Sequence, residues 1–162
     1  MSDTRANGCM FTGHRRVNPA HVSQLYARMY FLINHYYEDG CRDFYAGGAI
    51  GFDRMAGAAV LEYKRTHPDV KLHLILPCKD QDARWNHFER DAYQRQLAQA
   101  DTITYIAESY VDGCMKARNQ ALVDHARCCI AYAVEKSGGT VQTMRLASES
   151  GLRVHNIGAN LT

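Results

Sequence analysis

The sequence lacks the features that mark a membrane-bound or a secreted protein. No apolar run approaches the roughly 18–20 residues that a membrane-spanning helix needs. The N-terminus, MSDTRANG, has no apolar signal core. We therefore expect a cytoplasmic protein that does not associate with membranes.

The sequence also lacks a strong excess of charge and any paired metal-ligand motif. The formal net charge is only +2, which argues against a nucleic-acid partner. None of the six cysteines forms a C-x-x-C pair and the eight histidines are dispersed, so we expect no metal site and no required cofactor. In the cytosol the cysteines should be reduced and mostly buried.

What is present is a chain of 162 residues with 46% apolar and 22% charged residues, which is typical of one globular domain over residues 1–162. Short apolar runs alternate with segments of helical periodicity. The predicted strands are 9–12, 43–46, 71–76, 102–107, 128–134 and 153–157. The predicted helices are 19–38, 52–66, 82–99, 115–127 and 137–150.

This alternation predicts an α/β fold: a three-layer, doubly wound, mostly parallel six-stranded sheet with helices on both faces. Each loop with unusual residues follows a strand, so all these loops should lie at one edge of the sheet. Ligands of such sheets bind outside the carboxyl ends of the strands, where the strand order reverses. We therefore expect a ligand crevice there.

The stretch DFYAGGAIGFDRMAGAA, residues 43–59, predicts a strand, a tight glycine turn and a helix. Free N–H groups at a helix start favour an anion, and glycine lets a ligand approach the backbone. Gly47, Gly48 and Gly51 are thus candidate phosphate-binding residues. Asp53 could cap its own helix or accept a hydrogen bond from a sugar hydroxyl. The alternative is a tight turn with no ligand.

Two further loops carry residues suited to phosphate. The first offers Gly13, His14 and Arg15, where the arginine supplies a planar fork and the histidine could donate a hydrogen bond to phosphate or act as an acid or base. The second, Gly138-Gly139-Thr140, is a glycine turn before a helix. For the first loop, the alternative is a solvated surface loop.

Three more candidates lie beside these loops. Arg118 and Asn119 stand in the first turn of the helix predicted over 115–127, so Arg118 could reach over the crevice. The alternative is a surface arginine paired with a nearby acid. Trp85, the only tryptophan, could stack on a base, or it could be a packing residue or a dimer anchor.

Together these motifs resemble a known superfamily. A strand followed by TGHR, then AGGAIGFDRMA, an M-x-x-R-N helix start and SGGT before a helix resemble the SLOG superfamily, and in particular its YpsA-like branch. The resemblance covers about residues 9–157. The glycine turn is also similar to that of the Rossmann-like domain of DprA. The resemblance implies a Rossmann-like fold and a nucleotide or nucleotide-derived ligand, with a homo-oligomer (a dimer or larger) as the expected assembly.

The LOG branch of this superfamily hydrolyses nucleoside monophosphates and carries M-x-x-R-K and P-G-G-x-G-T-x-x-E. Met115 and Arg118 match the first motif, but Thr143 stands where the catalytic glutamate of the second would be. The expected function is therefore nucleotide binding for sensing or signalling. The alternatives are a hydrolase and DprA-like binding of single-stranded DNA. If the protein is an enzyme, the candidate catalytic residues are Arg118, Asp53, Glu89 and Asp112.

Overall fold

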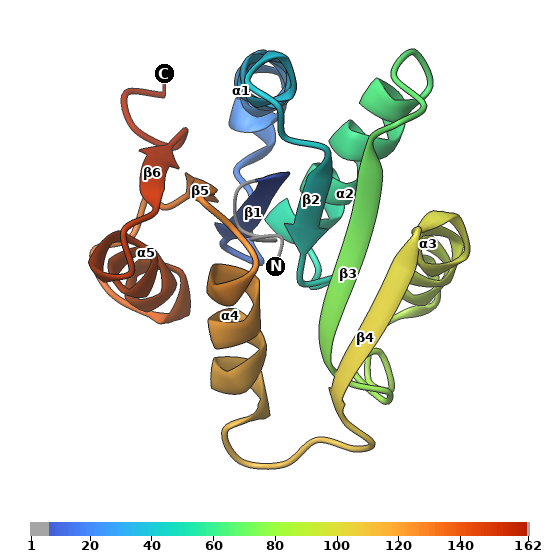
Figure 1. Cartoon of the computed structure of the whole chain (residues 1–162). Helices are drawn as coiled ribbons and strands as arrows, with labels where there is room; N and C mark the ends of the chain where they lie inside the picture. The colour runs from blue at the N-terminus through green and yellow to red at the C-terminus, as the bar shows by residue number, and fades with distance from the viewer. Residues whose placement is uncertain (1–6, 162) are drawn as a thin grey trace, which may run out of the picture.

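The computed structural model describes residues 7–161 and forms an α/β sandwich around one six-stranded sheet (Figure 1). The strand order is β4-β3-β2-β1-β5-β6, and every neighbouring pair is parallel. The predicted fold class is thus confirmed. The strands are β1 (Gly8–Gly13), β2 (Asp43–Ala46), β3 (Lys71–Cys78), β4 (Thr102–Ala107), β5 (Cys128–Tyr132) and β6 (Arg153–Asn156). The helices are the short 3₁₀ helix η2 (Pro19–His21), α1 (Val22–Glu38), α2 (Phe52–Lys64), α3 (His87–Gln99), α4 (Cys114–Asp124) and α5 (Gly139–Glu149).

Two apolar cores lie on opposite faces of the sheet. Successive residues of a strand point to opposite faces, so Phe11 of β1 packs in one core and Met10 in the other. The larger core receives side chains from α1, α2 and α3, and the smaller one from α4 and α5. The helices therefore cover both faces, with α4 and α5 on the opposite side from the other three (Figure 1).

The strand order reverses between β1 and β5. The chain passes from β1 to β2, β3 and β4 in one direction, then returns through α4 to β5 on the other side of β1. At such a point the connections leave in opposite directions and open a crevice at the carboxyl edge of the sheet. The loops that follow β1 and β5 border this crevice.

Two predicted boundaries were wrong around residues 77–86. The strand that was expected to stop before Pro77 continues to Cys78. Because β2 ends opposite Leu74, β3 has only β4 as a neighbour beyond that point, and Pro77 interrupts no bond to β2. The helix expected from residue 82 begins at His87, because the Asn86 side chain accepts a hydrogen bond from the Glu89 N–H at 2.9 Å and caps it.

The prediction of six reduced cysteines was also wrong. Cys9 and Cys128 form a disulfide, with their Cα atoms 4.9 Å apart. The two residues are register partners on the neighbouring strands β1 and β5, which a linear sequence does not reveal. Cys41 lies 3.9 Å from Cys9, sulfur to sulfur. The four free cysteines are all buried, as expected of small apolar side chains.

Within residues 7–161, no helix is long and apolar enough to cross a membrane. Most of the N-terminal stretch from which we argued against a signal peptide, residues 1–6, lies outside the described residues.

Candidate functional site

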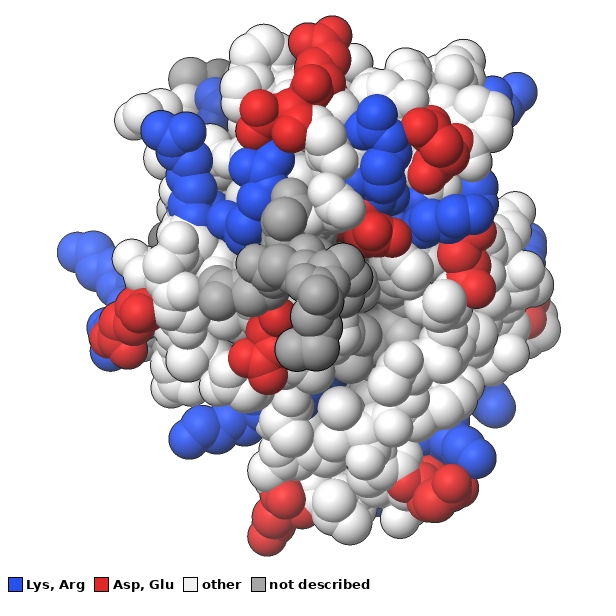
Figure 2. Space-filling view, in the orientation of Figure 1, with Lys and Arg blue, Asp and Glu red and all other residues white. Residues whose placement is uncertain are grey.

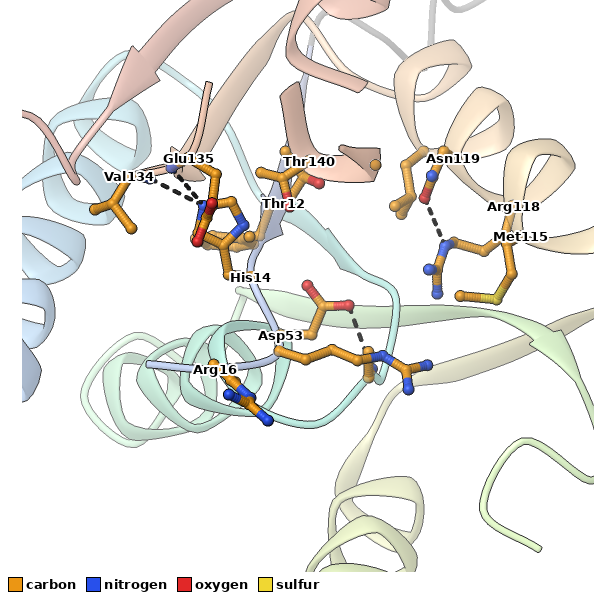
Figure 3. A pocket seen from close by; sticks show the side chains of 16 residues that line it. Thr12, His14, Arg16, Asp53, Met115, Arg118, Asn119, Val134, Glu135 and Thr140 are labelled. Atoms are coloured by element: carbon orange, nitrogen blue, oxygen red, sulfur yellow. Dashed lines mark hydrogen bonds between the residues drawn. The ribbon is translucent and has the colours of Figure 1, made fainter. Parts of the chain in front are cut away.

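A cavity of about 470 Å³ opens at the carboxyl edge, where the strand order reverses (Figure 3). It lies between the loops that follow β1 and β5 and the first turns of α2, α4 and α5. Backbone hydrogen bonds hold the loop after β1 in place: His14 N–H donates to the Tyr132 carbonyl and the His14 carbonyl accepts from Phe52 N–H. The polar and charged residues that line the cavity are Thr12, His14, Arg15, Arg16, Asp53, Arg118, Asn119, Glu135 and Thr140.

A buried pair of opposite charges forms one wall of this cavity. Arg118 and Asp53 are only 5% and 6% exposed, and both side chains lie beside Gly47 without a direct ion pair between them. Burial raises the pKa of Asp53, and the charge of Arg118 opposes that rise. Burial likewise lowers the pKa of Arg118, and the charge of Asp53 opposes that decrease. The alternative interpretation, a surface arginine, is therefore wrong: the pair is part of the protein interior.

Backbone groups of the glycine turn hold both members of the pair. Arg118 Nη1 donates to the Gly47 carbonyl at 2.6 Å, and Asp53 Oδ2 accepts from Ala49 N–H at 3.2 Å. Arg118 Nε also donates to Asn119 Oδ1 at 2.8 Å. A Cβ at Gly47 would lie 2.4 Å from Arg118 Nη1. Gly47 is thus needed for the approach of a protein side chain, whereas we had expected the approach of a ligand.

His14 joins the loops after β1 and β5. Its Nε2 accepts from the N–H groups of Val134 and Glu135, at 2.9 and 3.2 Å (Figure 3). A ring nitrogen that accepts carries no proton, so this geometry assigns the proton of a neutral ring to Nδ1. The roles predicted for His14 were donation to phosphate or acid–base action. Its Nε2 is engaged as an acceptor, so only Nδ1 remains for a donor role.

The helices that begin at the cavity have no side-chain cap. Gly51, Gly113 and Gly138 are the N-cap residues of α2, α4 and α5, and none of these helix starts has a side-chain capping bond. By contrast, α3, which does not border the cavity, is capped by Asn86. A Cβ at Gly138 or Gly139 would meet no atom within 4 Å. The start of α5 therefore combines open space with N–H groups that can bind an anion.

The structure brings some of the predicted residues to the cavity and not others. Gly48, Gly51 and Gly138 do not line it, and Gly47 contacts it only through Arg118. Glu89 pairs with Arg54 of α2, and the Thr143 hydroxyl donates to the Gly139 carbonyl inside α5 at 2.9 Å. Neither observation favours a hydrolase. The predicted residues that do line the cavity are Gly13, His14, Arg15, Asp53, Arg118, Asn119, Gly139 and Thr140.

Arg16 and Glu135, which were not among the predicted site residues, also line the cavity. Both lie in loops that follow strands and that we had already placed at this edge. Their position after the strand ends was the signal that could have identified them. Within the described part of the chain, no group of three or more His, Cys, Asp or Glu side chains could hold a metal ion.

Comparison with known families decides the relationship. The family model YpsA, described as the YspA SLOG family, matches residues 13–155, which include all the polar residues of the cavity except Thr12. The chain belongs to this SLOG family.

Curated proteins similar to this SLOG chain have no function in their names. The chain is 28% identical over 121 residues to the uncharacterized SPbeta prophage-derived protein YoqJ of Bacillus subtilis, covering 67% of this chain and 71% of YoqJ. It is 27% identical over 122 residues to a UPF0398 protein of Bacillus cereus strain G9842, covering 74% of this chain and 66% of that protein.

Two solved structures share the fold of this SLOG chain. DprA from Helicobacter pylori, described as binding single-stranded DNA, superposes with a TM-score of 0.66 at 20% identity, covering 93% of this chain and 64% of that chain. DprA from Streptococcus pneumoniae superposes with the same TM-score of 0.66 at 16% identity, covering 91% of this chain and 48% of that chain. The chain thus spans about half to two thirds of these longer proteins.

Proposed function

We propose that the cavity binds a nucleotide or a nucleotide-derived ligand through its phosphate. The observation that carries the proposal is the open, uncapped start of α5 at Gly138-Gly139-Thr140, which faces a cavity with Arg15 and Arg16 on the opposite loop. Both arginines are exposed, so their charges are free to meet an anion. Helix N–H groups and guanidinium groups are complementary to phosphate oxygens.

The buried pair has a different role in this proposal. Asp53 lines the cavity, and its Oδ2 is already engaged by Ala49 N–H. We assign the other carboxylate oxygen to a sugar hydroxyl. The charge of Arg118 favours the ionised form of Asp53, its bond to the Gly47 carbonyl fixes the glycine turn, and it adds positive charge near the phosphate. Such a site holds a ligand for sensing or signalling without requiring a reaction.

Replacing Arg15 with alanine should weaken the binding of AMP about tenfold or more, because a charge-assisted bond to phosphate is worth about 1.5–3 kcal/mol. Arg145→Ala is the matched control. It removes the same charge from the exposed face of α5, away from the cavity lining. Isothermal titration calorimetry measures both variants. Equal affinities for the two variants would contradict the proposed role of Arg15, and no binding of nucleotides by the unchanged protein would contradict the proposal itself. The same samples, checked for free base, test the hydrolase alternative.

Single-stranded DNA is a second candidate ligand, because DprA from Helicobacter pylori, a protein of the same fold, is described as binding it. On the face shown in Figure 2, lysine and arginine side chains alternate with acidic ones and form no broad basic surface. We assign such a DNA-binding mode to the cavity rim, where Arg15 and Arg16 are exposed. Fluorescence anisotropy with a labelled oligonucleotide at two salt concentrations tests it, since phosphate contacts weaken with salt. The cytoplasmic location and the homo-oligomer stay predictions from the sequence.

A further inference from the structure

A second cavity of about 460 Å³ adjoins the first. The two share Arg15 and Met115 in their linings, so these residues lie at the boundary between them. The second cavity lies between the segment that follows β3 and the loop that follows β4, at the same carboxyl edge of the sheet. A ligand that extended past Arg15 would pass from one cavity into the other.

Aromatic rings from two different loops line this second cavity. Trp85 is half-buried and packs edge-on against Tyr93, with ring centroids 5.1 Å apart and planes at 73°. Tyr110 is 63% exposed, and its backbone N–H donates to Asp80 Oδ1 at 3.1 Å. The edge contact fixes the Trp85 ring, and the bond from Tyr110 to Asp80 ties the two loops together.

Gln81 supplies a polar group that lacks a partner. Its Nε2 donates to the Tyr93 hydroxyl at 3.3 Å, whereas its Oε1 is buried with no hydrogen-bond partner among the described residues. A buried acceptor without a donor is costly, and native proteins usually satisfy it. Gln81 lines the cavity, so a small rotation of its terminal amide would let Oε1 meet a donor on a bound ligand.

We propose that this second cavity binds the base of the ligand, stacked on Trp85, with an amino group of the base donating to Gln81. The inference rests on the proposed function, in which the phosphate occupies the first cavity. Every base has a flat π-face that stacks on an aromatic ring, and amino groups occur on adenine, cytosine and guanine. Arg15, shared by both cavities, lies between phosphate and base. The ligand class is therefore a nucleotide with an amino-bearing base.

Two probes separate this inference from the proposed function: AMP, and ribose 5-phosphate, which lacks a base. Trp85→Ala should weaken AMP binding about tenfold and leave ribose 5-phosphate binding unchanged, because stacking contributes only to the base. Trp85→Phe should restore most of the affinity. Phe88→Ala is the control, since Phe88 is 83% exposed on the same segment and does not line the cavity.

The outcomes of this calorimetric titration are distinct. If ribose 5-phosphate and AMP bind equally well and Trp85→Ala changes neither, the second cavity binds no base, while the proposed function stands. If neither compound binds the unchanged protein, the proposed function fails and this inference fails with it. Retained binding of ribose 5-phosphate by Trp85→Ala shows that the variant is folded.

Inosine monophosphate tests the role of Gln81, because it has an oxygen where AMP has an amino group. AMP should bind about tenfold more tightly than inosine monophosphate, as expected when a buried acceptor is left without a donor. Gln81→Leu, of similar size but without polar atoms, should remove this preference. A preference for inosine monophosphate, or an unchanged preference in Gln81→Leu, would overturn the assignment.

Discussion

Replacing Arg118 with alanine is expected to lower the free energy of unfolding by about 3 kcal/mol or more at pH 7, because it removes a buried charge-assisted hydrogen bond to Gly47 and the opposite charge near the buried Asp53 carboxyl. The Asp53 carboxylate would stay buried with only the Ala49 N–H as a described partner. The Gly47 carbonyl would lose the bond from Nη1 as well. Urea unfolding monitored by circular dichroism measures the loss.

The pH dependence of this loss follows from the pKa of Asp53. Burial already raises the pKa of Asp53 above its value in the unfolded chain, and the charge of Arg118 opposes that rise. Removing Arg118 therefore raises the pKa of Asp53 further. A carboxyl whose pKa is raised by folding binds its proton more tightly in the folded state than in the unfolded one. The folded state is therefore favoured at low pH, and this advantage is lost as the pH rises. The deficit of Arg118→Ala should therefore shrink as the pH is lowered from 7 towards 4.

Two controls make this prediction specific to the opposite buried charges of Arg118 and Asp53. Lys116→Ala removes a positive charge from an exposed position of α4 and should change stability little. Asp53→Asn, added to Arg118→Ala, removes the buried charge and should recover part of the lost stability. A deficit that is constant with pH, or that Asp53→Asn deepens, would show that Arg118 acts by packing alone.

The fold could be predicted because its signals are local. Apolar runs of strand length alternate with helical periodicity, and this alternation alone implies a parallel sheet with crossover helices. The position of each loop after a strand then places it at one edge, which is how Arg15, Asp53 and Arg118 could be assigned to one cavity from the sequence alone. Errors arose where the end of a strand depends on its neighbouring strands. Pro77 is tolerated within β3 because β2 has already ended at that point.

The detailed contacts at the candidate site could not be predicted, because they depend on pairs far apart in sequence. Arg118 and Gly47 are 71 residues apart, and only the packed structure shows that the arginine occupies the space beside the glycine. The disulfide depends in the same way on the register of β1 and β5. A glycine in a sequence marks a close approach to its backbone, but not which group approaches. Here, Gly47 and Gly51 meet protein atoms, whereas Gly138 and Gly139 face open space.

Gly51→Ala is expected to cost about 3 kcal/mol or more in the free energy of unfolding, through backbone strain and a collision together. Gly51 has φ +87° and ψ −123°, a conformation that residues with a Cβ essentially do not adopt. The added Cβ would lie 2.1 Å from the carbonyl oxygen of Arg15, which is backbone and cannot rotate away. Relief requires the whole loop after β1 to move. Urea unfolding again measures the effect.

Gly113→Ala is the matched control, because Gly113 is also the N-cap of a helix, with φ +84° and ψ −5°. Its conformation is the left-handed one, which costs a residue with a Cβ about 1–2 kcal/mol, and no atom lies within 4 Å of the added carbon. Gly51→Ala should also weaken AMP binding, since the displaced loop carries Arg15, while Gly113→Ala should leave the arginine in place. Equal losses of stability in the two variants would mean that the loop after β1 yields to the added carbon. In that case, the contact between Gly51 and Arg15 does not hold that loop against the cavity.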